Sequence, residues 1–284
     1  MSTSKAVIQS LARALTGRNL HRDPQGNIVL ARPGTSVDHA PPASTVLTSR
    51  TADEVADSQG LYDLLRDRRL KTLIDHYRID VVVDVGANRG QFGQALRRTG
   101  YAGRIVSFEP VERNFQLLQQ TAQGDAQWQF HRLALGRENT EIEINVSDST
   151  VFSSFLDLNA WGKTHFGNEA APSRKEAVSV RRLDAILPQS GLDVSTARIL
   201  LKMDTQGFDL EAFAGASGLY DRICALQSEI SGVPIYDGMP HFTKSLEIYE
   251  AAGFKLAGMY PIHADGALSI IESDCLMVNP KLNP

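Results

Sequence analysis

Residues 81–90 decide the fold of this chain, and they read Val81-Val82-Val83-Asp84-Val85-Gly86-Ala87-Asn88-Arg89-Gly90. The β-branched block that opens this stretch is typical of a strand buried on both faces of a parallel sheet. Gly86 and Gly90 allow the backbone to turn tightly and to approach a ligand. The residues that follow, 91–98, read as a helix whose positive N-terminal end faces the turn. A strand, a glycine turn and a helix in this order predict a small-molecule site at the carboxyl end of a doubly wound sheet.

The spacing of the glycines distinguishes this turn from a dinucleotide-binding turn. The dinucleotide fingerprint G-x-G-x-x-G needs its second glycine so that a pyrophosphate can reach the helix N-terminus. Here Asn88 occupies that crowded middle position. The sequence also has no Tyr-x-x-x-Lys pair, so an NAD-linked oxidoreductase is disfavoured.

Strand-like and helix-like segments alternate along the rest of the chain, which predicts a doubly wound, Rossmann-like α/β fold. We expect a seven-stranded sheet that is mostly parallel, with an antiparallel closing strand. Residues 141–146 alternate polar with apolar side chains and are expected to form an edge or accessory strand. The remaining expected strands are 104–108, 128–133, 199–203, 223–230, 254–260 and 268–278, and the expected helices are 61–77, 114–122, 208–214 and 246–252.

The N-terminal part differs from the rest of the chain. Residues 32–51 are rich in Pro, Ser, Thr and Ala, a composition typical of an irregular arm or linker. We therefore expect residues 1–60 to be an N-terminal extension or arm and residues 61–284 to be one α/β domain.

Composition excludes several classes of function. The formal net charge of −4 gives no basic field, so nucleic acid is not an expected partner. No stretch approaches the roughly 20 apolar residues that a membrane span requires, and the N-terminus lacks the apolar core of a signal peptide. The two cysteines, Cys224 and Cys275, have neither metal-ligand spacing nor a disulfide framework. We expect a cytoplasmic protein whose partner is a small-molecule or glycan acceptor, and a homodimer is compatible with the sequence.

Two further segments carry chemistry. Glu109, in Phe108-Glu109-Pro110, lies about 20 residues beyond the glycine turn, where an acidic residue can accept hydrogen bonds from both ribose hydroxyls. Asp204 and its polar neighbours follow the expected strand 199–203 and would lie beside the same cleft. The sequence thus indicates a nucleoside next to a polar, potentially catalytic strand end.

These segments together resemble the FkbM family of class I, S-adenosylmethionine-dependent methyltransferases. The resemblance covers roughly residues 79 to 232 and rests on Val83-Asp84-Val85-Gly86-Ala87-Asn88, Phe108-Glu109-Pro110, Ala134-Leu135-Gly136 and Leu201-Lys202-Met203-Asp204. It implies that residues 61–284 form a class I methyltransferase domain that methylates a hydroxyl of a sugar, glycolipid or glycosylated natural product. The cofactor residues that it implies are Asp84, Gly86, Ala87, Asn88, Gly90, Phe92, Glu109, Pro110, Ala134 and Asp204.

The chain departs from the family pattern at the third motif. Members usually read K-x-D-x-E-G-x-E there, whereas this chain has Gln206 and Asp209 at the two Glu positions. Asp209 keeps the negative charge, but Gln206 is neutral and cannot act as a carboxylate base.

An alcohol acceptor is a poor nucleophile while it is neutral, so a general base or a metal ion would help to remove its proton. Asp204 is the leading candidate for the base. Lys202 lies two residues earlier and is expected on the same sheet face, where it would orient or tune the site unless it only extends to solvent. Glu229 ends the next strand and could share a Mg²⁺ ion with Asp204, although structural caps or salt bridges explain both carboxylates equally well. His241, in a turn-rich loop, is a possible base.

Two alternatives to O-methylation stay open. The first is an N- or carboxyl-methyltransferase of a small molecule, because the glycine turn does not specify the acceptor. The second is a non-catalytic partner protein that binds S-adenosylmethionine, which the neutral Gln206 would allow.

Overall fold

The computed structural model describes four short strands between residues 19 and 48, and then residues 54–147, 153–170 and 172–284. The chain divides into two compact units, Met1–Leu61 and Tyr62–Pro284. In the first unit, β1 (Asn19–Arg22) pairs antiparallel with β2 (Ile28–Ala31), and β3 (Ser36–Ala40) pairs antiparallel with β4 (Ser44–Thr48). The role of residues 1–60 as an extension or arm stays a prediction.

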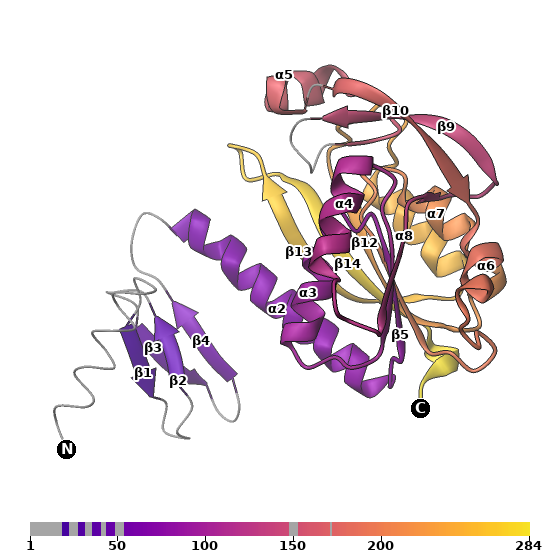
Figure 1. The fold of residues 1–284 in the computed structure, drawn as a ribbon. Helices are drawn as coiled ribbons and strands as arrows, with labels where there is room; N and C mark the ends of the chain where they lie inside the picture. Colours follow the sequence, from indigo (N-terminus) through magenta and orange to yellow (C-terminus); the bar gives the residue numbers. More distant parts are fainter. Residues whose placement is uncertain are drawn as a thin grey trace. The chain divides into compact units, whose positions relative to one another are not determined.

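A seven-stranded sheet forms the centre of the second unit (Figure 1). Only β14 (Ile270–Val278) runs antiparallel to the other strands, because it pairs antiparallel with both β12 (Ile223–Ser231) and β13 (Lys255–Ala264). This confirms the predicted Rossmann-like α/β fold with an antiparallel closing strand. In spatial order the strands are β13 (Lys255–Ala264), β14 (Ile270–Val278), β12 (Ile223–Ser231), β11 (Ile199–Met203), β5 (Val81–Val85), β6 (Arg104–Phe108) and β7 (Trp128–His131).

The order of the strands places a crevice beside β5. From β5 the chain continues outward through β6 and β7, and it returns to pair β11 with the opposite edge of β5. Ligands of open α/β sheets bind at such a switch point, outside the carboxyl ends of the strands.

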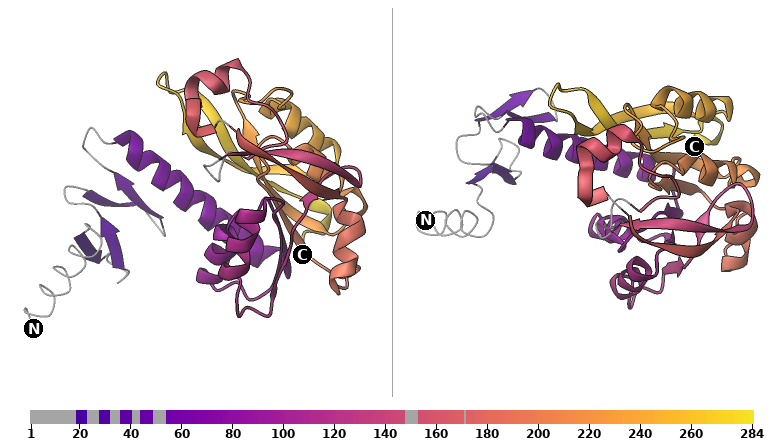
Figure 2. Two further views of the ribbon diagram at one scale, coloured as in Figure 1. Left: turned by 45° about the horizontal axis from the view of Figure 1, so that its top comes forward. Right: turned by 90° about the horizontal axis from the view of Figure 1, so that it is seen from above.

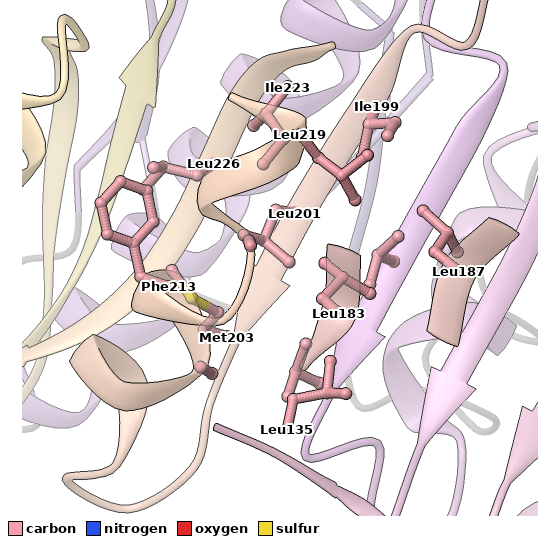
Figure 3. Close-up of a cluster of buried hydrophobic side chains, with 14 of the residues drawn as sticks. Leu135, Leu183, Leu187, Ile199, Leu201, Met203, Phe213, Leu219, Ile223 and Leu226 are labelled. Atoms are coloured by element: carbon pink, nitrogen blue, oxygen red, sulfur yellow. The ribbon is translucent and has the colours of Figure 1, made fainter. Parts of the chain in front are cut away.

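Helices cover both faces of the sheet, and alternate residues of β5 show which face each group covers. Val82 packs in a cluster with Leu96 and Leu118, which belong to α3 and α4. Val83 packs on the opposite face with Leu183 and Phe213, which belong to α6 and α7 (Figure 3). One group is α2 (Glu54–His76), α3 (Gln91–Arg98) and α4 (Glu112–Thr121), and the other is α6 (Leu183–Ile186), α7 (Asp209–Ala214) and α8 (Phe242–Ala251).

A small second sheet lies outside the main one, together with α5 (Ala160–Ala170) (Figure 2). It has the order β8-β10-β9, with β8 at Ala134–Leu135, β9 at Thr140–Ser147 and β10 at Pro172–Arg181. The accessory strand predicted at 141–146 is therefore confirmed as β9. Its partner β10 was not predicted, because its first half is exposed and polar and lacks an apolar period.

Several expected element boundaries differ from those of the structure. The third strand ends at His131 rather than at residue 133. The last hairpin turns later than expected, since β13 extends to Ala264 and β14 begins at Ile270. Three 3-10 turns complete the described chain, at Leu187–Ser190, Ser217–Leu219 and Pro280–Leu282. None of the helices in the described ranges is both long and apolar enough to cross a bilayer.

Candidate functional site

A cavity of about 610 Å³ opens at the switch point of the sheet. This volume is typical of a small-molecule site. The cavity is bounded by the glycine turn, by apolar side chains next to β6 and β8, and by polar side chains at the ends of β11, β12 and β14. Its lining includes Gly86, Asn88, Phe92, Glu109, Pro110, Val111, Ala134, Leu135, Ile144, Phe155, Lys202, Asp204, Gln206, Gln227, Glu229, Glu272 and Asp274.

The glycine turn is fixed against both neighbouring strands. The amides of Gly86 and Ala87 each donate a hydrogen bond to the carbonyl of Phe108, at 3.0 Å. On the other side, the amide of Asp204 donates to the carbonyl of Val85 at 3.1 Å. Gly86 has φ +72°, and a Cβ placed there would lie 1.9 Å from the carbonyl oxygen of Asp204. Only glycine fits this position, and its place beside Asp204 joins the turn to the polar strand end.

Glu109 is buried behind the turn, with 4% of its surface exposed. Its two carboxylate oxygens accept hydrogen bonds from the backbone amides of Asn88, at 2.8 Å, and Val111, at 2.9 Å. Burial raises the pKa of Glu109 to about 7, and these two hydrogen bonds oppose the rise. The Asn114 side chain also hydrogen-bonds to Glu109. A carboxylate has about four lone-pair sites, so Glu109 can still accept a hydrogen bond from a ligand in the cavity.

Lys202 is a buried cation beneath the turn. Its Nζ lies 3.1 Å from Asp84 Oδ1 and 3.5 Å from Asp204 Oδ2, and it donates to the carbonyl of Gly86 at 3.1 Å. Burial opposes the charge, but the neighbouring carboxylates of Asp84 and Asp204 raise the pKa of Lys202 above its ordinary value. Asp84 is fully buried and also accepts a hydrogen bond from Ser107 Oγ at 3.2 Å. Lys202 therefore joins the glycine turn, the centre of β5 and the end of β11.

Removing this cation is expected to destabilise the domain strongly. Lys202→Met leaves the carboxylate of Asp84 buried without its counter-ion, which typically costs about 3–5 kcal/mol. Urea unfolding measures this loss. The double variant Asp84→Asn/Lys202→Met should recover part of it, because both charges are then absent. Lys175→Met, which removes an exposed lysine 3.8 Å from Glu143, is the control and should change stability little. A loss below about 1 kcal/mol in Lys202→Met would contradict this prediction.

Asp204, Gln206 and Glu229 meet at the mouth of the cavity. The Asp204 side chain is 43% exposed, so its carboxylate is accessible. Gln206 Nε2 donates to Glu229 Oε2 at 2.9 Å, while Tyr236 Oη donates to Gln206 Oε1 at 3.1 Å. Burial, followed by the carboxylates of Glu272 and Asp204, raises the pKa of Glu229 well above its ordinary value. The neutral Gln206 thus supplies a donor to Glu229 where a glutamate would add another negative charge.

Asp209, at the second departure from the family pattern, holds the strand ends together. It accepts hydrogen bonds from the Thr205 amide at 2.9 Å, the Thr205 hydroxyl, Ser228 Oγ at 2.7 Å and the Glu229 amide at 3.1 Å. Burial raises the pKa of Asp209 to about 6. Its contacts fix the loops that carry Asp204 and Glu229, so it is a positioning residue.

The sequence analysis did not single out several polar residues of the cavity, among them Gln227, Glu272 and Asp274. Asp274 lies opposite Glu229 in the β12–β14 register, and it accepts hydrogen bonds from Gln227 Nε2 at 3.0 Å and from Arg66 at 2.9 Å. Glu272 contacts His263 Nδ1 at 3.2 Å. The alternation Glu272-Ser273-Asp274 within an apolar strand was the available signal, but only the pairing with β12 directs it toward this cavity.

The structure brings most of the predicted site residues together around the cavity. Asp84, Ala87 and Gly90 support the turn from beneath and do not line the cavity. His241 lies at the N-cap of α8, where its ring accepts from the Thr243 amide, and it also does not line the cavity. His263, which the sequence analysis did not single out, lies in β13 and lines the cavity. The predicted residues that line the cavity are Gly86, Asn88, Phe92, Glu109, Pro110, Ala134, Lys202, Asp204 and Glu229.

The donor set gives the predicted Mg²⁺ site no support. Within the described residues, no group of three or more His, Cys, Asp and Glu side chains is arranged to hold a metal ion. Asp204 and Glu229 alone provide two carboxylates, and one oxygen of Glu229 already accepts from Gln206.

Comparisons with known proteins give one family match and several remote structural similarities. A family model described as the methyltransferase FkbM domain matches residues 84–256, which is more than half of the chain. No curated protein matches. Among solved structures, magnesium protoporphyrin IX methyltransferase from Synechocystis PCC 6803 with bound SAM is 12% identical, with 82% of this chain and 86% of that chain covered and a TM-score of 0.43. The methyltransferase domain of bacterial CtHen1-CN is 8% identical, with 76% and 99% covered and a TM-score of 0.43. An rRNA methylase from Streptococcus thermophilus is 10% identical, with 71% and 87% covered and a TM-score of 0.38.

Proposed function

The chain belongs to the FkbM family of S-adenosylmethionine-dependent methyltransferases, and on that premise we propose that it methylates a hydroxyl of a sugar, glycolipid or glycosylated natural product. The observation that carries this proposal is the contact between Gly86 and Asp204. The backbone of the glycine turn lies directly against the backbone of Asp204. The carboxylate of that residue is 43% exposed, and it lines the same cavity as the turn. A proton acceptor thus lies next to the expected cofactor turn.

The residues present fit S-adenosylmethionine. The close approach at Gly86 leaves no room for a side chain and allows a ligand to lie along the backbone of the turn. Glu109 would accept hydrogen bonds from the ribose hydroxyls. The apolar side chains of Pro110, Ala134 and Leu135 would enclose the adenine. The backbone at Asn88 and the ring of Phe92 would complete the cofactor side of the cavity.

When bound, the cofactor supplies a methyl group on a positively charged sulfur, and the sulfur leaves as a neutral thioether. Asp204 would accept the proton of the acceptor hydroxyl while the new oxygen–carbon bond forms. Lys202, 3.5 Å from Asp204, orients that carboxylate and balances part of its charge. Burial and its carboxylate neighbours favour the protonated form of Glu229 by raising its pKa, so Glu229 is not assigned as the base. Alignment of the acceptor with the methyl group would supply much of the remaining acceleration.

A direct test is transfer of a labelled methyl group from S-adenosylmethionine to a panel of glycans and glycosides, with the position of the label determined by mass spectrometry. A label on a sugar oxygen supports the proposal. A label on nitrogen or on a carboxyl group would replace it with one of the two other acceptor classes. Cofactor binding without transfer to any acceptor would favour a non-catalytic partner protein. If a chelator abolished the activity and added Mg²⁺ restored it, the mechanism would require the metal ion.

The carboxyl-methyltransferase alternative is disfavoured by charge. Asp204 and Glu272 both line the cavity, and a carboxylate acceptor would enter beside them with the same sign of charge. Hydroxyl groups, in contrast, are donors that match these oxygens. Localisation in the cytoplasm and assembly as a homodimer stay predictions.

Cofactor affinity is expected to depend on pH through Glu109. Its pKa of about 7 means that the unliganded carboxyl is partly protonated at neutral pH, and only the ionised form offers all its lone pairs to ribose hydroxyls. Affinity for S-adenosylhomocysteine, measured by calorimetry, should therefore rise from about pH 5.5 through pH 7 and level off only above about pH 8, where the free carboxyl is fully ionised. Glu109→Gln should bind more weakly and with a flatter pH profile. Glu112→Gln, at the exposed start of α4, should keep the wild-type profile. If Glu109→Gln showed the same pH dependence as the wild type, a group other than Glu109 would be responsible for that dependence.

A further inference from the structure

The acceptor side of the cavity carries more carboxylates than the methyl-transfer step uses. Asp204 follows β11, Glu229 lies in β12, and Glu272 and Asp274 lie in β14. Glu229 is the register partner of Asp274, and Glu272 is two residues away from Asp274 on the same strand. Because side chains two residues apart point to the same face of a strand, all three strand carboxylates belong to one face of the sheet. We call Asp204, Glu229, Glu272 and Asp274 the carboxylate wall.

Positive charge near the carboxylate wall is scarce and already shared. In the described part of the chain, two permanent cations form ion pairs with it. Lys202 pairs with Asp204 but also with the fully buried Asp84. Arg66 pairs with Asp274 at 2.9 Å but also with Asp63 and Asp67. A third, titratable cation is His263, whose pKa is raised by its hydrogen bond to Glu272. With all four carboxyls ionised, the wall would carry more negative charge than these shared partners offset.

Two buried oxygens at this wall have no partner within the described residues. Glu272 is 5% exposed, and its Oε2 contacts His263, but its Oε1 has no hydrogen-bond partner. Gln227 is 6% exposed, and its Nε2 donates to Asp274, but its Oε1 is likewise without a donor. Buried polar atoms are normally hydrogen-bonded, so a pair of unsatisfied acceptors on cavity-lining residues points to a ligand that brings donors.

We propose that the carboxylate wall binds a protonated amine that the acceptor carries beside the hydroxyl to be methylated. A primary ammonium group brings three N–H donors and one positive charge, which are what the unsatisfied oxygens and the excess carboxylates lack. A neutral hydroxyl would bring a donor but no charge. The inference rests on the proposed function and narrows its acceptor to an amino sugar or a comparable amino alcohol.

The ionisation of the wall supports this assignment. Burial and the Glu272 and Asp204 carboxylates raise the pKa of Glu229, and burial also raises the pKa of Asp274. Without a ligand, protonation of Glu229 and Asp274 reduces the repulsion among the four carboxylates. A bound ammonium group would favour the ionised forms of these two residues, so binding should release protons to the solvent.

The test is calorimetric titration of the full chain, saturated with S-adenosylhomocysteine, with three methyl glycosides: those of glucosamine, glucose and N-acetylglucosamine. The glucosamine glycoside should bind at least tenfold more tightly than the other two. Repeating the titration in two buffers of different ionisation enthalpy should reveal proton release for glucosamine alone. Glu272→Gln should weaken glucosamine binding about tenfold, whereas Glu247→Gln, on the exposed side of α8, should not.

Three results would overturn the inference: no saturable binding of the glucosamine glycoside, equal binding of all three glycosides, or saturable binding of Mg²⁺ alone that Glu272→Gln abolishes. The comparison among glycosides uses the wild-type chain, so it stands even if Glu272→Gln does not fold. The methyl-transfer assay distinguishes failure of the proposed function from failure of the amine inference. In the transfer assay, a label on nitrogen would refute O-methylation, whereas equal O-methylation of glucose and glucosamine glycosides would refute only the amine inference.

Discussion

Gly86→Ala is expected to destabilise the domain by about 3 kcal/mol or more and to abolish measurable S-adenosylmethionine binding. Two costs combine at this position. The φ of +72° lies in the left-handed region, where an L-residue costs about 1–2 kcal/mol. In addition, the new Cβ would lie 1.9 Å from the carbonyl oxygen of Asp204, which is backbone and cannot rotate away. The turn and the end of β11 would have to separate.

Gly100→Ala is the matched control, because it separates the two costs. Gly100 has φ +87°, but a Cβ placed there meets no atom within 4 Å. It should lose only about 1–2 kcal/mol and keep its cofactor affinity. Urea unfolding gives the stabilities, and calorimetry gives the affinities. If the two alanine variants were equally stable and bound the cofactor equally well, the close contact between the turn and Asp204 would be refuted.

The glycine turn could be predicted because its determinants are local. Residues 81–90 contain the strand and the turn that leads into the helix, and Gly86 makes the tight turn that its sequence position predicted, with a positive φ. Glu109 and Asp204 could be placed for a related reason. Each one ends a parallel strand, and the carboxyl ends of parallel strands meet at one edge of the sheet.

The carboxylate wall could not be predicted in the same way, because it depends on pairing between distant segments. Glu272 and Asp274 face the cavity only because β14 pairs with β12 in the register that sets Glu229 against Asp274. A shift of one residue would turn both side chains to the opposite face. Arg66 reaches Asp274 across more than 200 residues of sequence. His241 failed to reach the cavity for a local reason, since its ring caps α8.

The role of Gln206, at a position where the family usually has Glu, could be seen only in the structure. The sequence shows only that a carboxylate is missing there. In the structure, its amide lies between Glu229 and Tyr236, donating to the first and accepting from the second. A glutamate there would place another negative charge against Glu229, whose pKa burial and neighbouring carboxylates already raise well above the ordinary value. The substitution is therefore compatible with a working acceptor site.

Asp204→Asn is expected to lower kcat about 10²- to 10⁴-fold, the usual contribution of a positioned general base. Asparagine keeps the shape of the side chain but cannot take the proton of the acceptor hydroxyl. The fold should tolerate the change, because Lys202 keeps its shorter contact with Asp84, at 3.1 Å. The fixed backbone contacts of residue 204 with Val85 and Gly86 do not involve its side chain. S-adenosylmethionine affinity should consequently change far less than kcat.

Glu229→Gln is the comparison that tests the division of roles. Glutamine resembles the protonated form of Glu229, which burial and its neighbours favour in the unliganded site. Its kcat should therefore fall much less than that of Asp204→Asn. With an amine-bearing acceptor, KM should rise instead, because one carboxylate of the wall is lost. Single-turnover methyl transfer separates the chemical step from binding. If Glu229→Gln lost kcat and Asp204→Asn kept it, the base would be Glu229, and Asp204 would serve only to hold Lys202 and the glycine turn in place.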